Sequence, residues 1–253
     1  MVDAYQEDLA YIHDAGYGGH ARSAAPVLLR ALRQAGAERG LVIDLGCGSG
    51  ILAAEIAAAG YDVLGFDISG AMVALARRRV PQARFREQSL WTAEFPPCVA
   101  VTAVGECFNY LFDPDNTDQA LAKLFRRIHD ALCPGGLLLF DVAEPGRVPG
   151  SGPRRDYREG DDWAVLVTAE EDRPHRRLTR RITSFRKVGR FYRREQEVHR
   201  LRLLSGAALA RQLRGLGFRV RLLRGYGEFR FPPGYAALLG RKPGHVPAGQ
   251  RRA

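Results

Sequence analysis

Three glycines and an aspartate are the residues of this chain whose types and spacing best fit ligand chemistry. Gly46, Gly48 and Gly50 stand at alternate positions directly after the apolar run 41–45. Glycines spaced in this way let the backbone turn tightly and leave room for a ligand to lie against it. Asp67 ends the next apolar run, at a position where a carboxylate can accept two hydrogen bonds from the hydroxyls of a ribose. The pattern therefore predicts a site for a nucleoside-containing ligand.

The residues around the glycines predict the elements that position them. Residues 41–45 form a buried strand, Gly46–Gly50 a turn and the following residues a helix, and a second strand ends at Asp67. A nicotinamide cofactor is the obvious competing ligand, but its fingerprint has glycine at the first, third and sixth positions. Here the third glycine comes one position early and Ile51 occupies the sixth position. An ordinary strand-to-helix turn is the other alternative, and it does not account for the aspartate.

With Asp44 two residues before Gly46, this spacing resembles motif I of the class I S-adenosylmethionine-dependent methyltransferases. The resemblance implies S-adenosyl-L-methionine as cofactor and an α/β fold, a Rossmann-like, seven-stranded, mostly parallel sheet with helices on both faces. Ser89 stands where many relatives carry an aspartate that contacts the adenine amine, and Gln88 or a backbone group would replace that contact. The implied cofactor-binding residues are Asp44, Gly46, Cys47, Gly48, Gly50, Asp67, Ile68, Gln88, Ser89, Leu90 and Gly105.

Length and composition limit which other classes of protein this chain can belong to. A chain of 253 residues, 46% of them hydrophobic, can bury one large domain or one domain with an insertion. It has no apolar run of about 18 residues, so we expect no membrane span. The polar, acidic N-terminus does not look like a signal peptide, which favours a cytoplasmic location. The four cysteines lack a metal-ligand spacing, so we expect reduced thiols and no metal site.

The charge is divided unevenly along the chain. Residues 1–150 carry a net charge of −5 and residues 151–253 a net charge of +15, and arginine supplies nearly all of the basic side chains. One interpretation is a compositional bias of the coding sequence. The other is that the basic half meets an anionic substrate, nucleic acid or an acidic partner.

The pattern along the chain alternates strand and helix, which predicts a parallel sheet. Ser69, Thr117 and Ser205 are predicted helix N-caps. The turn Pro134–Gly136 is expected to lead into a strand at 137–142, and long arginine-rich strands with hairpin turns follow from 163 to 204. We expect a helical lid (1–40), a cofactor-binding core (41–145), an antiparallel insert for substrate capping or dimerisation (154–204), a completion of the core (205–241) and a disordered tail (242–253).

Residues after the fourth core strand, Gly105–Leu111, resemble motif IV of small-molecule methyltransferases, which lines the passage from cofactor to acceptor. Transfer from a sulfonium is an in-line displacement that requires alignment, exclusion of water and control of one proton. The candidates for the proton are Glu106, His13 and His199, each also open to a structural role. The candidates for substrate binding are Tyr17, Asn109, Tyr110, Tyr226 and Arg230.

The resemblance thus predicts transfer of a methyl group to a nitrogen or oxygen of a small molecule. The antiparallel insert is similar to that of bacterial sugar N-methyltransferases, in some of which it mediates dimerisation, so a homodimer is a further expectation. Two alternatives remain: an RNA or protein methyltransferase that uses the basic half, and a non-catalytic cofactor-binding protein.

Overall fold

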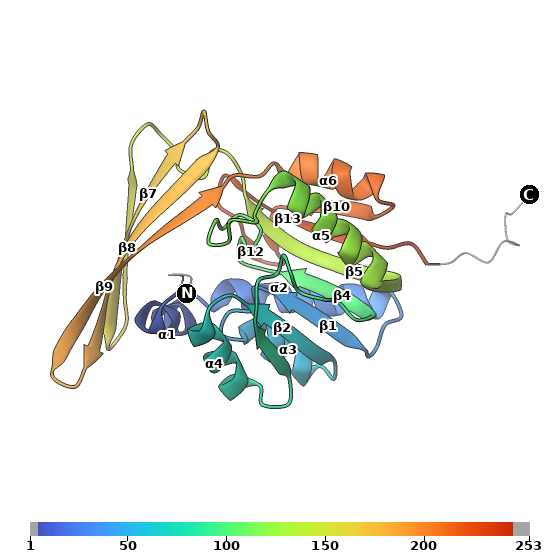
Figure 1. The fold of residues 1–253 in the computed structure, drawn as a ribbon, viewed down its shortest axis with the longest axis horizontal. Coiled ribbons are helices and arrows are strands. Elements are labelled where there is room, and N and C mark those ends of the chain that lie inside the picture. Colours follow the sequence, from blue (N-terminus) through green and yellow to red (C-terminus); the bar gives the residue numbers. More distant parts are fainter. Residues whose placement is uncertain (1–4, 245–253) are drawn as a thin grey trace, which may run out of the picture.

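The computed structural model describes residues 5–244, and a seven-stranded sheet forms its centre (Figure 1). The strand order is β10-β13-β5-β4-β1-β2-β3, and β13 runs antiparallel to both of its neighbours while β1 to β5 are parallel. The order reverses between β1 and β4, where ligands bind in open α/β sheets. The strands are β1 (Leu41–Leu45), β2 (Asp62–Asp67), β3 (Arg84–Glu87), β4 (Cys98–Ala103), β5 (Leu132–Ala143), β10 (Arg219–Leu223) and β13 (Tyr235–Arg241).

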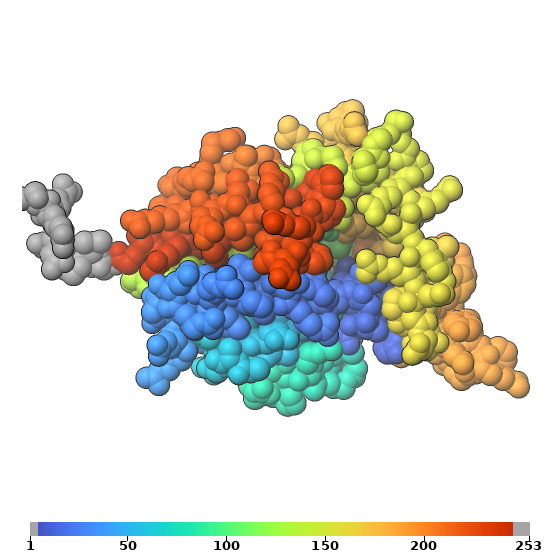
Figure 2. All heavy atoms as spheres, turned by 180° about the vertical axis from the view of Figure 1, so that it is seen from behind, coloured from blue at the N-terminus to red at the C-terminus, as the bar shows by residue number. Residues whose placement is uncertain are grey.

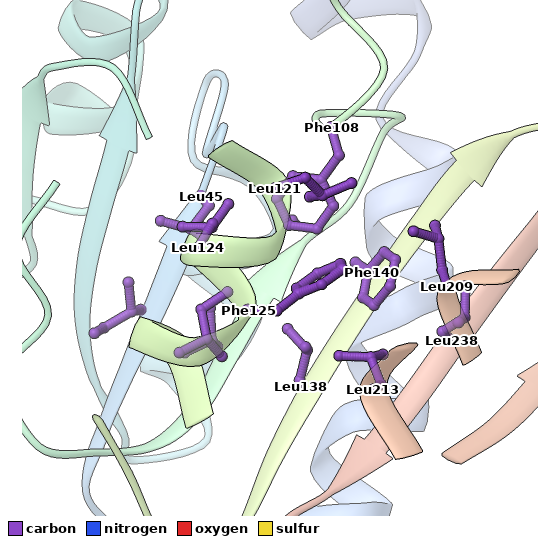
Figure 3. Packing of buried hydrophobic residues seen from close by; sticks show 14 of the residues in the cluster. Leu45, Phe108, Leu121, Leu124, Phe125, Leu138, Phe140, Leu209, Leu213 and Leu238 are labelled. Carbon is purple, nitrogen blue, oxygen red and sulfur yellow. The ribbon is translucent and has the colours of Figure 1, made fainter. Parts of the chain in front are cut away.

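Helices cover both faces of this sheet, which confirms the predicted fold class. Apolar side chains of α2 (Gly19–Gln34), α3 (Ile51–Ala58) and α4 (Gly70–Arg79) pack on one face. Side chains of α5 (Asp118–Ala131) and α6 (Gly206–Gly215) pack on the other. Figure 3 shows this second layer, in which Phe125 of α5 lies against Phe140 of β5.

The helix starts follow from the predicted caps. The Ser69 hydroxyl accepts a hydrogen bond from the Met72 N–H (3.2 Å), and Thr117 and Ser205 do the same for α5 and α6 at 3.1 and 3.3 Å. Each bond satisfies one of the backbone donors that an α-helix leaves without an internal partner.

A four-stranded antiparallel sheet stands at one end of the central sheet, and its far tip projects beyond the rest of the molecule (Figures 1 and 2). Its strands are β6 (Arg154–Glu159), β7 (Trp163–Asp172), β8 (Arg177–Val188) and β9 (Phe191–Arg202). Helix α1 (Glu7–Gly16) packs on it through Leu9 and Ile12, and the Asp8 carboxylate accepts hydrogen bonds from Arg186 and Arg193. The N-terminal helix is therefore held by the insert.

Three details differ from the sequence-based expectations. Strand β6 was not predicted, because all six of its residues are exposed and show no alternation. Strand β5 begins at Leu132 rather than 137, since the Pro134–Gly136 turn lies inside an irregularity of its pairing with β4. The short hairpin of β11 (Gly225–Tyr226) and β12 (Phe229–Arg230) was also not foreseen.

Both predicted terminal segments extend past the described residues. Residues 1–4 of the expected lid and 245–253 of the expected tail lie outside the described range. Lys242, the first residue of that tail, donates its amine to the carbonyls of His129 and Leu132, each at 2.7 Å. All four cysteines are free thiols. Between residues 5 and 244, no helix has the length and apolar content that crossing a membrane requires.

Candidate functional site

A cavity of about 130 Å³ lies at the carboxyl ends of β1, β2 and β4, which we call the glycine-turn cavity. Eight of the eleven residues implied as cofactor ligands line it. They are Gly46, Gly48, Asp67, Ile68, Gln88, Ser89, Leu90 and Gly105. A Cβ atom added to Gly48 would meet nothing closer than the Met72 sulfur at 4.0 Å, so this glycine leaves open space beside the backbone.

Asp67 closes the glycine turn from the end of β2. Its Oδ2 accepts the Gly48 N–H at 2.8 Å and its Oδ1 accepts the Ser69 N–H at 2.9 Å. Burial raises the pKa of Asp67, although these backbone hydrogen bonds oppose the shift. Each oxygen keeps a second lone pair, so the carboxylate can still accept two hydroxyl donors from a ligand in the cavity.

The other three implied ligands do not line the cavity. Gly50 serves packing instead, because a Cβ there would lie 3.0 Å from the Cα of Ala76 on α4 and its φ is +77°. Cys47 is buried among apolar side chains of α2, α3 and α4. Asp44 is also buried, and its Oδ1 accepts the Thr102 hydroxyl at 2.6 Å.

Asp44 carries an unusual electrostatic cost. No group between residues 5 and 244 bonds to its Oδ2. Burial, with a smaller contribution from Asp67, raises the pKa of Asp44 from 3.8 to about 7, and the Thr102 hydrogen bond only partly opposes this.

We expect Asp44→Asn to stabilise the ligand-free protein in a pH-dependent way. Because the folded-state pKa is raised, the wild type loses stability as pH rises from 3.8 through about 7. The variant should therefore gain at most about 4 kcal/mol at pH 8 and at most about 1.6 kcal/mol at pH 5. Urea denaturation at both pH values measures the difference, with the exposed Asp62→Asn as control. An equal effect of Asp44→Asn at pH 5 and pH 8 would contradict this account of Asp44.

A second, larger cavity of about 510 Å³ lies between the N-terminal helices, the central sheet and the insert, and we call it the insert cavity. Four residues line both cavities: Tyr5, His13, Gly105 and Tyr110. They mark where a group held in one cavity comes closest to a group held in the other.

Tyr5 is fixed at this junction from three sides. Its N–H donates to Glu197 of the insert and its carbonyl accepts the Ser69 hydroxyl, each at 2.9 Å. Its own hydroxyl lies 3.0 Å from the Tyr110 hydroxyl. The start of the lid is thus tied to the insert, to the end of β2 and to the loop after β4.

Glu106 is placed beside the junction but is not suited to take a proton. Its carboxylate lies 2.7 Å from Arg180 and 3.4 Å from Arg147. Burial alone would raise the pKa of Glu106, but these two cations outweigh it and hold the pKa below its usual value. The prediction of Glu106 as a base is therefore not supported, because an ionised carboxylate paired with two arginines is a weak proton acceptor.

The two other predicted bases, His13 and His199, both line the insert cavity, but their surroundings differ. Burial lowers the pKa of His13 to about 4, which makes it a weak base at neutral pH. His199 is buried, and its Nε2 bonds to Glu197 at 2.8 Å. The same Glu197 carboxylate accepts the N–H groups of Tyr5 and Gln6, so this pair holds the start of α1.

Of the predicted substrate ligands, Tyr17 and Tyr110 line the insert cavity. Asn109 does not, because its buried side-chain amide is used inside the protein. The amide nitrogen donates to the carbonyls of Ala143 and Arg202, and the amide oxygen accepts the Ala143 N–H. Tyr226 is buried behind the cavity wall and donates its hydroxyl to Asp141 at 2.8 Å. Arg230 is exposed on the β11–β12 hairpin, outside both cavity linings.

Sequence reasoning missed Asp141 near the end of β5. This fully buried carboxylate accepts the N–H groups of Gly105 (3.0 Å) and Glu106 (2.7 Å) and a hydrogen bond from His20 at 2.9 Å. It thereby orders the loop after β4. The available signal was an acidic residue inside an otherwise apolar strand, because a buried carboxylate requires hydrogen-bond or ion-pair partners.

Comparison with known proteins agrees with this geometry. Residues 42–136 match the family model of a methyltransferase domain. YqeM of Bacillus subtilis (strain 168), a protein named as a methyltransferase, is 24% identical over 196 residues, which cover 72% of this chain and 75% of YqeM.

Two solved structures share the fold over nearly their whole length. An S-adenosylmethionine-dependent methyltransferase from Clostridium acetobutylicum ATCC 824 superposes with a TM-score of 0.77 at 17% identity, covering 93% of this chain and 98% of that one. The S-adenosylmethionine-bound amino pentose methyltransferase CalS10 from Micromonospora echinaspora gives a TM-score of 0.72 at 21% identity, covering 94% and 98%.

The fold is that of the Rossmann-like methyltransferases, and residues 42–136 match a methyltransferase domain. The chain carries a methyltransferase domain and is a methyltransferase enzyme.

Proposed function

We propose that this enzyme transfers the methyl group of S-adenosyl-L-methionine to a nitrogen or oxygen of a small anionic molecule bound in the insert cavity. The observation that carries the proposal is the set of four residues, Tyr5, His13, Gly105 and Tyr110, that line both cavities. Two ligands held on either side of them have their reacting groups brought together, which is the main requirement of a direct methyl transfer.

The residues of the glycine-turn cavity suit the cofactor's parts. Asp67 would accept the two ribose hydroxyls, and the backbone at Gly48 leaves space for the sugar and the methionine portion. Ile68 and Leu90 would flank the adenine. When bound, the cofactor supplies an activated methyl group. The protein must then align the two reactants, exclude water and accept the proton that the acceptor loses.

The size of the insert cavity favours a small acceptor. A volume of about 510 Å³ falls within the usual range for small-molecule sites, about 300 to 1,000 Å³. Aromatic side chains of Tyr5, Tyr17 and Tyr110 form part of its wall. The likeness in fold to an amino pentose methyltransferase supports a nitrogen acceptor, and an oxygen acceptor is the other arm of the proposal.

The charges around the insert cavity favour an acceptor with an anionic group. Its lining includes two acidic side chains, and four arginines outnumber them. The charge of Arg154 is neutralised by Asp156, which lies 3.0 Å away. Arg180 and Arg147 both pair with the single carboxylate of Glu106. The remaining cation, Arg158 on β6, lies over the Tyr17 ring at 4.6 Å. A carboxylate or phosphate on the acceptor would complement this excess.

Methyl transfer to an extract of small metabolites tests the proposal directly. The protein is incubated with methyl-labelled S-adenosyl-L-methionine and the extract, and labelled products are separated and identified. We expect label in an anionic compound of low molecular mass. Label found only in RNA or protein, or no turnover with an intact cofactor site, would contradict the proposal.

Arg158→Gln should weaken acceptor binding and leave the cofactor site intact. Removing the one unshared cation should raise the acceptor KM about tenfold, the effect of one lost hydrogen bond to a charged group. The control is Arg155→Gln, also exposed on β6 but absent from the cavity lining. Steady-state kinetics with the identified acceptor and calorimetry with S-adenosylhomocysteine separate the two sites. Equal KM values for both variants would contradict the anionic assignment.

A further inference from the structure

His20, near the start of α2, presents a third imidazole to the insert cavity, and its side chain is 22% exposed. We propose that His20, oriented by the buried Asp141, is the general base that accepts the proton lost by the acceptor on methylation. This inference rests on the proposed function and assigns one of its chemical roles.

Asp141 fixes which nitrogen of His20 carries a proton. Burial alone would raise the pKa of Asp141, but hydrogen bonds from His20 and Tyr235 and the Glu106 N–H hold it below its usual value. The carboxylate is therefore ionised and accepts only. Because His20 Nε2 lies 2.9 Å from Asp141 Oδ2, Nε2 carries the hydrogen and Nδ1 keeps its lone pair. This is the way a buried carboxylate sets the tautomer of a catalytic histidine.

The ring of His20 is held firmly in this orientation. Four aromatic rings surround it at centroid distances of 5.3 to 5.7 Å: Tyr226, Phe229, Phe231 and Tyr235. Tyr226 and Tyr235 also donate their hydroxyls to Asp141, at 2.8 and 2.7 Å. Within the described part of the chain, His20 Nδ1 makes no hydrogen bond, so it is available to an acceptor.

The position of His20 relative to the junction suits the role. Asp141 Oδ2 accepts from His20 Nε2 and also from the Gly105 N–H at 3.2 Å. His20 is therefore two hydrogen bonds away from Gly105, one of the four residues that line both cavities. An acceptor that fills the insert cavity up to this junction lies beside the imidazole.

The other candidates are less suited to be the base. Glu106 is paired with two arginines, and burial lowers the pKa of His13 to about 4. His199 is sealed at 1% side-chain exposure and serves, with Glu197, to hold the lid. His20 alone among these four combines exposure to the insert cavity with a carboxylate partner that has no arginine contact.

The proposed step balances in atoms and charge. The lone pair of the acceptor oxygen or nitrogen forms a bond to the methyl carbon, and the carbon–sulfur bond breaks with its electron pair left on sulfur. The acceptor's proton adds to the Nδ1 lone pair of His20. The positive charge of the sulfonium thus ends on the imidazolium, which Asp141 stabilises, and the proton later passes to solvent.

His20→Gln is the first test, because the glutamine amide can still donate to Asp141 but cannot accept a proton. With methyl-labelled S-adenosyl-L-methionine and the acceptor purified from the metabolite extract, we expect kcat to fall about 100-fold or more. Both KM values should stay within about threefold, since the interaction matters mainly in the transition state. The control is His175→Gln, which alters an exposed histidine paired with Asp172 on the insert hairpin.

Two further measurements separate catalysis from structure. In His20→Ala, added imidazole should restore part of the lost rate, which no merely structural role predicts. Nitrogen-15 NMR of the wild type, without any ligand, should show the His20 proton on Nε2. Turnover by the wild type with unchanged kcat in His20→Gln, or a proton on Nδ1, would overturn the inference alone. Absence of turnover by the wild type would contradict the proposed function itself.

Discussion

Replacing Asp67 by alanine should abolish useful cofactor binding, with at least a 100-fold rise in the dissociation constant for S-adenosylhomocysteine. The wild-type carboxylate is expected to accept two ribose hydroxyls while it holds the N–H groups of Gly48 and Ser69. Hydrogen bonds to a charged group contribute about 1.5–3 kcal/mol each, and each 1.4 kcal/mol is about tenfold in affinity. Isothermal titration calorimetry measures the change directly.

The matched control is Asp62→Ala. Asp62 begins the same strand that Asp67 ends, but it is exposed at the opposite edge of the sheet, so cofactor affinity should not change. Asp67→Asn serves as a second variant if Asp67→Ala does not fold. Its amide keeps one acceptor oxygen, so the affinity of this variant for S-adenosylhomocysteine should fall by an intermediate amount. Wild-type affinity in both Asp67 variants would contradict the assigned cofactor site.

The part of the site that was predictable rests on signals that are local in sequence. The strand, glycine turn and helix from Leu41 onward form one unit, and Asp67 follows within the same unit. The caps Ser69, Thr117 and Ser205 act on backbone groups three residues away. Because these interactions close within a few residues, or within one strand–helix–strand unit, spacing alone specifies them.

Roles decided by distant partners were not predictable in the same way. Glu106 resembles a catalytic base in sequence, but Arg180, 74 residues further along, reaches it from the insert and fixes its charge. Asn109 resembles a substrate ligand, but the end of β5 and Arg202 consume its amide. His20 and Asp141 are separated by 121 residues and meet only when α2 packs on the sheet. Such contacts depend on tertiary packing.

The pairing of Glu106 with Arg180 and Arg147 leads to the largest expected effect on stability. Glu106→Gln leaves two guanidinium groups without their shared anion, one of them, Arg180, only 17% exposed in its side chain. Breaking a buried ion pair in this way costs about 3–5 kcal/mol. Urea denaturation at pH 7 should show that loss, whereas the exposed Glu228→Gln should change stability by less than about 0.5 kcal/mol.

The pH dependence of this loss identifies its cause. Because the folded-state pKa of Glu106 is below its usual 4.5, the pairing stabilises the wild type above that value. Its contribution is lost as pH falls from 4.5 through the lowered folded-state pKa. The stability gap between wild type and Glu106→Gln should therefore narrow in acid. A gap of the same size at pH 7 and pH 3.5 would point to lost packing rather than lost charge.

A double variant tests whether Glu106 and Arg180 are energetically coupled. Glu106→Gln combined with Arg180→Met removes both the anion and its main cation, and an apolar side chain replaces a desolvated guanidinium. Replacing both partners of a buried ion pair is often close to neutral, whereas removing one is not. The double variant should therefore be more stable than Glu106→Gln alone. If the two effects on stability simply add, Glu106 and Arg180 are not coupled. The instability of Glu106→Gln would then not arise from loss of the ion pair with Arg180.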